Sequence, residues 1–335
     1  MLTKKTILVV GGAGYIGSHM VHALGEQGYQ VIVLDNLSKG YADAVLHGEL
    51  IVGDMGDAAL LQRIFTRHTI DAVMHFASFI EVGESVQQPA KYYENNVAKT
   101  LTLLQAMQAH DVSTFIFSST AAVYGVPQYT PIDLLHPKAP INPYGHSKWM
   151  VEQMLQDFDR AYGLKSAVLR YFNAAGAHPD GILGERHEPE SHLIPLVLQA
   201  ASGRRKNIKI YGEDYPTDDG SCVRDYIHVS DLCEAHLLAL QSLFADTDSF
   251  SLNLGTGEGY SVKELIAAAK KITGKNFTVI ISERRLGDPP TLVADVKAAN
   301  TMLNWQAQRG LNDIIADAWA WELNLCESNR CEGMK

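Results

Sequence analysis

The sequence is poor in cysteine and has no long apolar run. Its four cysteines, Cys222, Cys233, Cys326 and Cys331, form no C-x-x-C pair. A chain of 335 residues needs no disulfide staples, so we expect reduced thiols, a cytoplasmic protein and no metal site. The first apolar run, residues 7–10, is too short for a signal peptide, and no run approaches the length that crosses a membrane. These absences argue against a disulfide-rich secreted scaffold and a membrane protein.

Basic residues are also in the minority. Lysine and arginine total 28 against 38 aspartate and glutamate residues, which gives a net charge of −10. An acidic chain is repelled by nucleic-acid backbones and by anionic lipid surfaces, so we expect no nucleic-acid and no membrane partner. The balance leaves room for a local basic pocket that binds a small phosphate compound. The sequence contains no internal repeat and no low-complexity segment.

Apolar strand patterns alternate with helical patterns through the first half of the chain. The segments TILVVGG, YQVIVLD, GELIVGD, DAVMHFA, STFIFSS and KSAVLRYFN are apolar without alternation, which is typical of parallel strands buried on both faces. We therefore predict an α/β fold with a doubly wound parallel sheet over residues 1–173. Residues 174–335 are richer in loops and predict a smaller, discontinuous second lobe, with residues 225–260 rejoining the large domain. Residues 89–109 predict one long helix, and residues 326–335 a frayed tail.

Glycines are concentrated between the first predicted strand and the first predicted helix. Gly12, Gly14 and Gly17 match G-x-G-x-x-G, and Gly11, Gly14 and Gly17 match the variant G-x-x-G-x-x-G. Glycine lets the backbone turn tightly and approach a pyrophosphate, which the following helix N-terminus attracts. The alternative is a tight turn without a ligand. Because this turn opens an alternating chain, we favour a dinucleotide-binding turn over residues 11–17.

Two aspartates follow predicted strands near this turn. Asp35 ends the second strand, where a carboxylate accepts hydrogen bonds from ribose hydroxyls and repels a 2′-phosphate, so the pattern favours NAD over NADP. A surface aspartate at the end of a strand is the simpler alternative. Asp54 ends another strand and is placed to meet the adenine amino group, although the pattern alone does not decide this.

Tyr144 and Lys148 are four residues apart in NPYGHSK, at the start of a predicted helix. Residues at this spacing share a helix face, so the ammonium is expected to lower the phenol pKa of about 10 towards neutrality. A shift of about 3 pKa units requires about 4 kcal/mol, which Lys148 and an oxidised nicotinamide ring are expected to supply together. Thr120, in SSTAAVYG, is positioned to hold a reacting hydroxyl. For an isolated pair, packing of Tyr144 on the Lys148 stem is the alternative, and the dinucleotide turn favours catalysis.

The motifs GGAGYIGSH, DNLS, HFAS, SSTAAVYG and YGHSK together resemble the extended short-chain dehydrogenase/reductase family. Within this family, VGESVQQPAKYYENNV, LRYFNAAGAHPDG, DYPTDDGSCVRDYIHV, LNLGTG and RRLGDPP are similar to the UDP-glucose 4-epimerases. The resemblance covers residues 6 to about 321. It implies a Rossmann domain with tightly bound NAD, a second lobe that binds UDP-sugars, and a homodimer. It also implies reversible C4 epimerisation of UDP-glucose and UDP-galactose through a 4-keto intermediate.

The resemblance assigns roles to residues at matching positions. Tyr144 becomes the base for the sugar 4-hydroxyl, Lys148 tunes it and binds the nicotinamide ribose, and Thr120 hydrogen-bonds the same hydroxyl. The implied cofactor contacts are Gly11, Gly14, Tyr15, Ile16, Asp35, Asn36, Asp54, Met55, Phe76, Ala77, Ser78, Asn95, Tyr144, Lys148 and Tyr171. The implied substrate contacts are Thr120, Tyr144, Asn173, His192, Leu193, Lys209, Ile210, Tyr211, Arg224, Arg285, Asp288 and Leu292. The two arginines suit a diphosphate because a guanidinium binds phosphate oxygens in a bidentate manner.

Several positions depart from the common family pattern. Thr120 stands where many members carry serine and keeps the hydroxyl, whereas Ile80 stands where some carry a lysine beside the cofactor. Leu292 is intermediate between the bulky tyrosine and the small residues found there, so activity on UDP-N-acetylglucosamine and UDP-N-acetylgalactosamine stays open. Family 4,6-dehydratases and UDP-glucuronate decarboxylases carry acids where Ala121 and Ala122 stand, which argues against both reactions. A non-catalytic NAD-binding scaffold is the remaining alternative.

Overall fold

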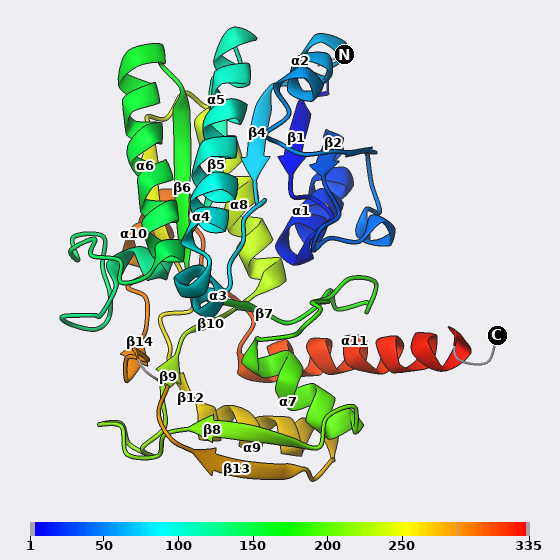
Figure 1. The fold of residues 1–335 in the computed structure, drawn as a ribbon, viewed down its shortest axis with the longest axis vertical. Coiled ribbons are helices and arrows are strands. Elements are labelled where there is room, and N and C mark those ends of the chain that lie inside the picture. The colour runs from blue at the N-terminus through cyan, green and yellow to red at the C-terminus, as the bar shows by residue number, and fades with distance from the viewer. Residues whose placement is uncertain (1–3, 286, 333–335) are drawn as a thin grey trace.

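A seven-stranded parallel sheet forms the centre of the large domain in the computed structural model, which describes residues 4–285 and 287–332 (Figure 1). Its strand order is β11 (Phe250–Leu254), β6 (Lys165–Tyr171), β5 (Thr114–Thr120), β4 (Ala72–His75), β1 (Thr6–Val10), β2 (Gln30–Asp35) and β3 (Glu49–Val52). The order reverses between β1 and β4, so a ligand crevice is expected beyond the carboxyl ends of these strands. The predicted α/β class with a doubly wound parallel sheet is confirmed.

Helices cover both faces of this sheet. On one face, Ile7 and Val9 of β1 share a core with α1 (Tyr15–Glu26), α8 (Val229–Phe244) and α10 (Lys297–Leu303). On the other face, Leu8 and Val10 share a core with α2 (Ala58–Arg67), α5 (Lys99–Ala109) and α6 (Pro143–Tyr162). Alternate residues of β1 therefore point into separate cores, which explains why the strand is apolar throughout.

The segment predicted as one helix over residues 89–109 contains a π-helical turn. It consists of α4 (Pro89–Tyr93), the π turn Glu94–Ala98 and α5, and it follows the short helix α3 (Val82–Gln87). The amide of Asn96 in this turn donates to the Phe79 carbonyl at 3.0 Å and to the Ser147 hydroxyl at 3.1 Å. The turn thus joins this helical segment to α6, and such turns are frequent at functional sites.

The second lobe lies below the large sheet in Figure 1. Its parallel strands β8 (Asn207–Tyr211) and β13 (Thr278–Ser282) pack with α7 (Leu193–Ser202), α9 (Val262–Thr273) and α11 (Leu311–Glu332) around a core of its own. Short strands complete it: β7 (Asn173–Ala175) pairs with β10 (Tyr226–His228), and β9 (Val223–Arg224) lies between β12 (Tyr260–Ser261) and β14 (Thr291–Leu292). The chain crosses between the lobes repeatedly, because α8, β11 and α10 belong to the large domain.

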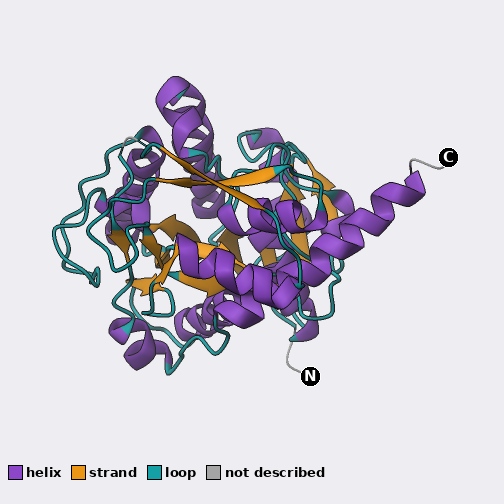
Figure 2. Cartoon of the chain, turned by 90° about the horizontal axis from the view of Figure 1, so that it is seen from below, coloured by secondary structure: helices purple, strands orange, loops and turns teal. Residues whose placement is uncertain are grey.

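The frayed tail predicted for residues 326–335 is wrong for most of its length. Helix α11 continues to Glu332, and its last turns project beyond the body of the molecule (Figure 2). Residues 333–335 lie outside the described residues. Within the described ranges, no helix combines the length and the apolar character needed to cross a membrane.

Candidate active site

The turn between β1 and α1 uses glycine where no side chain fits. Gly11 has a φ of +82°, and a Cβ there would lie 2.4 Å from the Ala77 nitrogen. A Cβ on Gly17 would lie 2.1 Å from the Gly11 oxygen. Gly14 differs, because an added Cβ would meet only the Gly11 oxygen, at 3.5 Å. The glycines therefore pack the helix against the turn and leave the backbone at Gly14 open to a ligand.

The N-terminus of α1 fits the pyrophosphate of a dinucleotide. Gly14 caps the helix without a side-chain hydrogen bond, and the first turn of this helix carries no acidic residue. The first backbone N–H groups of a helix lack intrahelical partners, and the helix dipole favours an anion beside them. The residues of the predicted turn, Tyr15 and Ile16 included, thus fit NAD at its diphosphate.

Asp35 supports this turn from the end of β2. Its Oδ2 accepts a hydrogen bond from the Ala13 nitrogen at 2.9 Å, and its Oδ1 accepts one from the Leu37 nitrogen at 2.8 Å. The residue is 8% exposed. A carboxylate has further acceptor positions, so ribose hydroxyls also fit here, whereas a 2′-phosphate would be repelled. The bond to Ala13 is a structural role that the sequence analysis did not foresee.

Asp54 is bound by protein groups. Its carboxylate accepts from Lys99 Nζ at 2.7 Å and from the Gly56 nitrogen at 2.7 Å. Burial acts to raise its pKa, but the bonds with Lys99 and Gly56 outweigh burial and lower it. The neighbouring Met55 is buried, and Asn36 accepts from the Ser38 nitrogen at 3.0 Å. Contact of Asp54 with adenine stays a prediction.

The chain after β4 and the end of β6 line the crevice beside the glycine turn. The nitrogens of Phe76 and Ala77 both donate to the Val10 carbonyl, at 2.7 and 3.1 Å. Tyr171 ends β6 and shares a short hydrogen bond with the Ser118 hydroxyl. Tyr15 donates to the Gly176 carbonyl at 2.7 Å and so links α1 to the second lobe.

Thr120 and Tyr144 meet at the carboxyl end of the sheet. Thr120 ends β5, and Tyr144 lies in the first turn of α6, whose N-cap residue Asn142 accepts from the Gly145 nitrogen at 2.9 Å. Burial raises the pKa of Tyr144, and a hydrogen bond with Thr120 acts in the opposite direction without cancelling it. The roles of these two hydroxyls in a reaction stay predictions.

Lys148 lies one turn further along α6 and is directed at the sheet. Its Nζ donates to the Ser78 hydroxyl at 2.8 Å and to the Ser118 carbonyl at 2.7 Å. Burial lowers its pKa to about 7, while Glu152 acts to raise it. In this structure burial decides the pKa of Tyr144, whereas the sequence analysis expected Lys148 to lower it. A positive charge that lowers the pKa of Tyr144 further would have to come from a bound ligand.

A buried ion pair between Arg170 and Glu152 lies one turn further along α6 than Lys148. Arg170 Nη2 donates to Glu152 Oε2 at 2.6 Å and Nε donates to Oε1 at 3.0 Å, so the pair is bidentate. The Ser119 hydroxyl donates to the same carboxylate at 2.5 Å, and Arg170 also donates to Tyr124 at 3.0 Å. The sequence analysis missed this network. The sequence contains one indication of it: Glu152 follows Lys148 by four residues, a spacing that places both on the same face of the helix.

The predicted diphosphate residues come together in the second lobe. Arg285 Nε donates to Asp288 at 2.8 Å, and its guanidinium stacks 4.9 Å from the Tyr211 ring centre. Arg224 lies 3.8 Å from the other Asp288 oxygen and donates to the Pro289 carbonyl at 2.9 Å. Two guanidinium groups share one carboxylate, which leaves net positive charge for an anionic ligand. Leu292 pairs with Arg224 across β14 and β9 and packs against the small apolar cluster of Ala121, Val123, Tyr124 and Ile132.

The remaining predicted residues belong to several elements of both lobes. Asn173 donates to the Asp225 carbonyl at 2.8 Å, while His192 and Leu193 begin α7. Lys209, Ile210 and Tyr211 form the end of β8, where Ile210 is buried and the other two are exposed. Asn95 lies in the π turn and donates to Asn96 at 3.0 Å. Ile80 is 40% exposed. Their contacts with ligands stay predictions.

Comparison with known proteins identifies relatives that span almost the whole chain. Residues 7–255 match the NAD dependent epimerase/dehydratase family. A UDP-glucose 4-epimerase of Halalkalibacterium halodurans is 54% identical over 316 residues, which cover 94% of this chain and 95% of the relative. The predicted family is thereby confirmed.

Solved structures agree with the sequence relatives. The UDP-glucose 4-epimerase of Brucella ovis in complex with NAD superposes with a TM-score of 0.92 at 47% identity, covering 94% of this chain and 97% of that one. The UDP-Glc/GlcNAc 4-epimerase of Campylobacter jejuni superposes with a TM-score of 0.84 at 42% identity, covering 96% and 99%. The chain therefore belongs to the NAD dependent epimerase/dehydratase family and, within it, to the UDP-glucose 4-epimerases.

Proposed function

We propose that this chain interconverts UDP-glucose and UDP-galactose by reversible inversion at C4, through a 4-keto intermediate. The observation that carries the proposal is the meeting of Thr120, Tyr144 and Lys148 at the carboxyl end of β5, beside the glycine turn. A non-catalytic scaffold would have no use for this arrangement. Ala121 and Ala122 offer no proton to drive elimination or decarboxylation, which favours epimerisation among the family reactions.

Each of the three residues has a separate task in this reaction. Tyr144 takes the proton of the sugar 4-hydroxyl and later returns it to the opposite configuration. Thr120, at the end of β5 and close enough to act on the pKa of Tyr144, is proposed to hold the reacting oxygen in line. Lys148 binds the nicotinamide ribose and brings a positive charge close to the phenol. NAD, the cofactor of this family, supplies the hydride acceptor and donor and a positive ring that favours the phenolate.

The second lobe would hold the UDP group. Arg224 and Arg285 suit the diphosphate, because each guanidinium offers several donors and both share the one carboxylate of Asp288. The 4-keto sugar must turn to present its other face, so the lobe should bind the UDP group firmly and the sugar loosely. Asn173 and His192 lie where the lobe meets the large domain and are proposed to contact the substrate from that side.

A conversion assay without added cofactor tests the function. Purified protein incubated with UDP-galactose should form UDP-glucose, because NAD stays bound through purification. Tyr144→Phe should lower turnover by about 10²–10⁴-fold, the usual contribution of a general base, while the protein keeps its NAD content. Tyr162→Phe, at the exposed end of α6, makes the same chemical change away from the site and serves as the control. Turnover near the wild-type rate in Tyr144→Phe would disprove the assigned base.

We propose an additional activity of the same site on UDP-N-acetylglucosamine and UDP-N-acetylgalactosamine. Leu292 lies beside Arg224 and packs against the apolar cluster that contains Val123 and Ile132, so we propose that its size limits the space for the sugar. A hydrophobic edge of this kind discriminates weakly between substrates that differ by one small group. The ratio of initial rates with UDP-galactose and UDP-N-acetylgalactosamine measures this activity. An undetectable rate with UDP-N-acetylgalactosamine would rule out the additional activity.

We also propose that the protein forms a homodimer through α5 and α6. These helices lie side by side on one face of the sheet, and Leu101 and Met150 are 37% and 41% exposed on them (Figure 1). Burial of such side chains between two copies would be favourable. Light scattering after gel filtration should give twice the chain mass of 36.8 kDa. The double variant Leu101→Glu, Met150→Glu should elute as a monomer, and a monomeric wild type would overturn the proposal.

The cytoplasm is the proposed location. Cys222 and Cys233 are buried free thiols, which persist in a reducing compartment. Cell fractionation with an antibody against the chain would test the location.

A further inference from the structure

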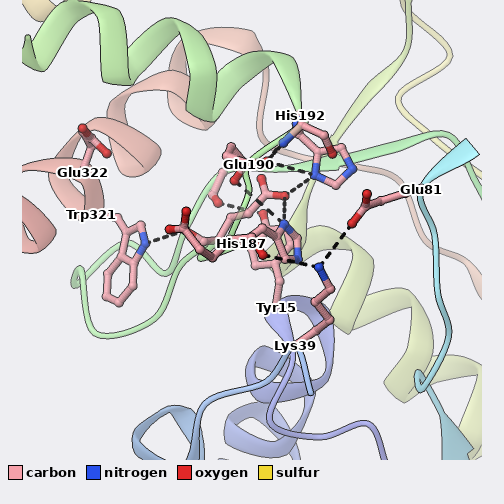
Figure 3. Close-up of polar contacts among 12 residues, drawn as sticks. Tyr15, Lys39, Glu81, His187, Glu190, His192, Trp321 and Glu322 are labelled. Atoms are coloured by element: carbon pink, nitrogen blue, oxygen red, sulfur yellow. Dashed lines mark hydrogen bonds and ion pairs between the residues drawn. The ribbon is translucent and has the colours of Figure 1, made fainter. Parts of the chain in front are cut away.

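Four potential metal ligands converge in the loop that precedes α7, outside the groups that the proposed reaction uses for proton and hydride transfer. They are Glu185, His187, Glu190 and His192, spaced as E-x-H-x-P-E-x-H. One ligand atom from each residue lies within 4.8 Å of the others. Figure 3 shows His187, Glu190 and His192 close together in this loop, joined by dashed polar contacts. The sequence analysis expected no metal site because it considered cysteine spacing alone.

The distances within this cluster suit a small cation. His187 Nδ1 lies 3.1 Å from Glu185 Oε1 and 3.8 Å from Glu190 Oε2, and His192 Nδ1 lies 3.6 Å from Glu190 Oε1. His192 Nδ1 also contacts Glu185 Oε1 closely. Ligands about 2.0–2.2 Å from a tetrahedral zinc ion are separated by about 3.3–3.6 Å, so small adjustments would bring all four to one ion.

Outer contacts orient the carboxylates. Glu190 Oε1 accepts from the backbone nitrogens of Ser191 at 2.7 Å and His192 at 2.8 Å. Glu185 is 8% exposed. Trp321 of α11 donates to the backbone carbonyl of Glu185 at 2.9 Å and so holds the loop in place. Metal sites commonly have such an outer layer, because it fixes the ligands before the ion binds.

An ion-pair network without metal is the competing explanation. In that case both imidazoles would be protonated and paired with the carboxylates. The two positive rings would then lie 5.4 Å apart, centre to centre, and share one Glu185 oxygen. A divalent cation removes this repulsion, because two neutral imidazoles and two carboxylates together balance its charge.

We propose that Glu185, His187, Glu190 and His192 form a closed, structural site for a divalent cation of the zinc class. Two imidazole nitrogens and two carboxylate oxygens are ligands that zinc accepts in tetrahedral geometry. Four protein ligands leave no open position, so the ion would stabilise the loop and take no part in the reaction. It would fix His192 through Nδ1 and leave Nε2 for a substrate.

The site lies in a segment that connects both lobes. Lys39 of the large domain donates to the Glu188 carbonyl at 3.4 Å and to Glu81 at 3.3 Å, and Trp321 contacts the loop from α11 (Figure 3). An ion at this point would hold the loop against both Lys39 of the large domain and Trp321 of α11. Loss of the ion should therefore lower thermal stability and raise KM for the UDP-sugar more than it lowers kcat.

Metal analysis of the holoenzyme tests the proposal. Protein purified without a histidine tag and without chelator should contain about one zinc per chain by plasma mass spectrometry. Glu185→Gln and His187→Gln should each lose the metal at unchanged NAD content. His47→Gln is the control, because it alters the more exposed trio His22, Glu26 and His47. Cobalt exchanged into the wild type should give the intense visible absorption of a tetrahedral ion, and Glu185→Gln should not.

Each outcome decides the assignment. Less than about 0.1 metal per chain, both as purified and after incubation with zinc and gel filtration, would mean an ion-pair network only. Metal that is lost in His47→Gln and kept in Glu185→Gln would place the ion in the other trio and overturn the proposal. Because none of these readouts uses epimerase activity, failure of the metal site and failure of the proposed reaction are distinguishable.

Discussion

Replacing Lys148 by methionine is expected to abolish turnover and to stabilise the fold at neutral pH. The side chain is 2% exposed, and burial lowers the pKa of its ammonium from 10.5 to about 7. At about 1.4 kcal/mol per pKa unit, keeping the charged form buried costs about 5 kcal/mol below pH 7. Methionine has a similar length and carries no charge, so it removes this cost.

The sign of the pH dependence follows from the lowered pKa. Between pH 7 and 10.5 the unfolded chain holds a proton that the folded chain has lost, so the unfolding free energy of the wild type rises with pH. From pH 6 to pH 9 the cost falls from about 5 to about 2 kcal/mol. Methionine leaves the Ser78 hydroxyl and the Ser118 carbonyl without their donor, which lowers the unfolding free energy by about 2 kcal/mol at every pH. The variant should be about 3 kcal/mol more stable at pH 6 and about equally stable at pH 9.

Urea unfolding followed by tryptophan fluorescence measures this difference at several pH values and constant ionic strength. NAD is first removed from both proteins, because bound cofactor would add its own stabilisation. Lys275→Met, at an exposed lysine after α9, is the matched control and should show no pH-dependent difference. A stability difference between Lys148→Met and wild type that stays constant from pH 6 to pH 9 would refute the reasoning.

Three further predictions follow from the packing around the site. Arg170→Met leaves Glu152 buried without its partner and should lower the unfolding free energy by about 3–5 kcal/mol in urea; a change below about 1 kcal/mol would contradict this. Gly17→Ala places a Cβ 2.1 Å from the Gly11 oxygen, so the purified variant should contain little NAD by absorbance after acid release, and a full complement would be inconsistent with this contact. Leu292→Ala should raise the rate with UDP-N-acetylgalactosamine relative to UDP-galactose by about 10-fold. An unchanged ratio would show that Leu292 does not limit the size of the sugar that the site accepts.

The features predicted well from the sequence depend on local geometry. The glycine turn was recognisable because its requirements are met within seven residues, from Gly11 to Gly17. The strands of the sheet were recognisable because burial on both faces gives continuous apolar runs such as Ile7 to Val10. Tyr144 and Lys148 were linked by helical spacing, which places them one turn apart on α6.

The features that were missed depend on contacts between distant segments. Lys148 binds Ser78 and Ser118, which follow or belong to other strands, and no local pattern indicates this. The π turn at Glu94–Ala98 adds a residue to a turn whose composition suits an ordinary helix. The tail was misjudged because its polar residues gave no apolar periodicity, although the helix of α11 continues through them to Glu332.

The arrangement of charges along α6 explains why Lys148 is available to a ligand. Tyr144, Lys148 and Glu152 follow one another at intervals of four residues on one helix face, yet only Glu152 has an oppositely charged partner in contact, Arg170. If Glu152 lacked Arg170, its carboxylate would be the nearest group to neutralise Lys148. The ion pair with Arg170 thus keeps the carboxylate occupied, and the ammonium retains a charge that neutral groups alone solvate. That charge destabilises the free fold, and in the proposed reaction it is available to bind ribose hydroxyls and to lower the pKa of Tyr144.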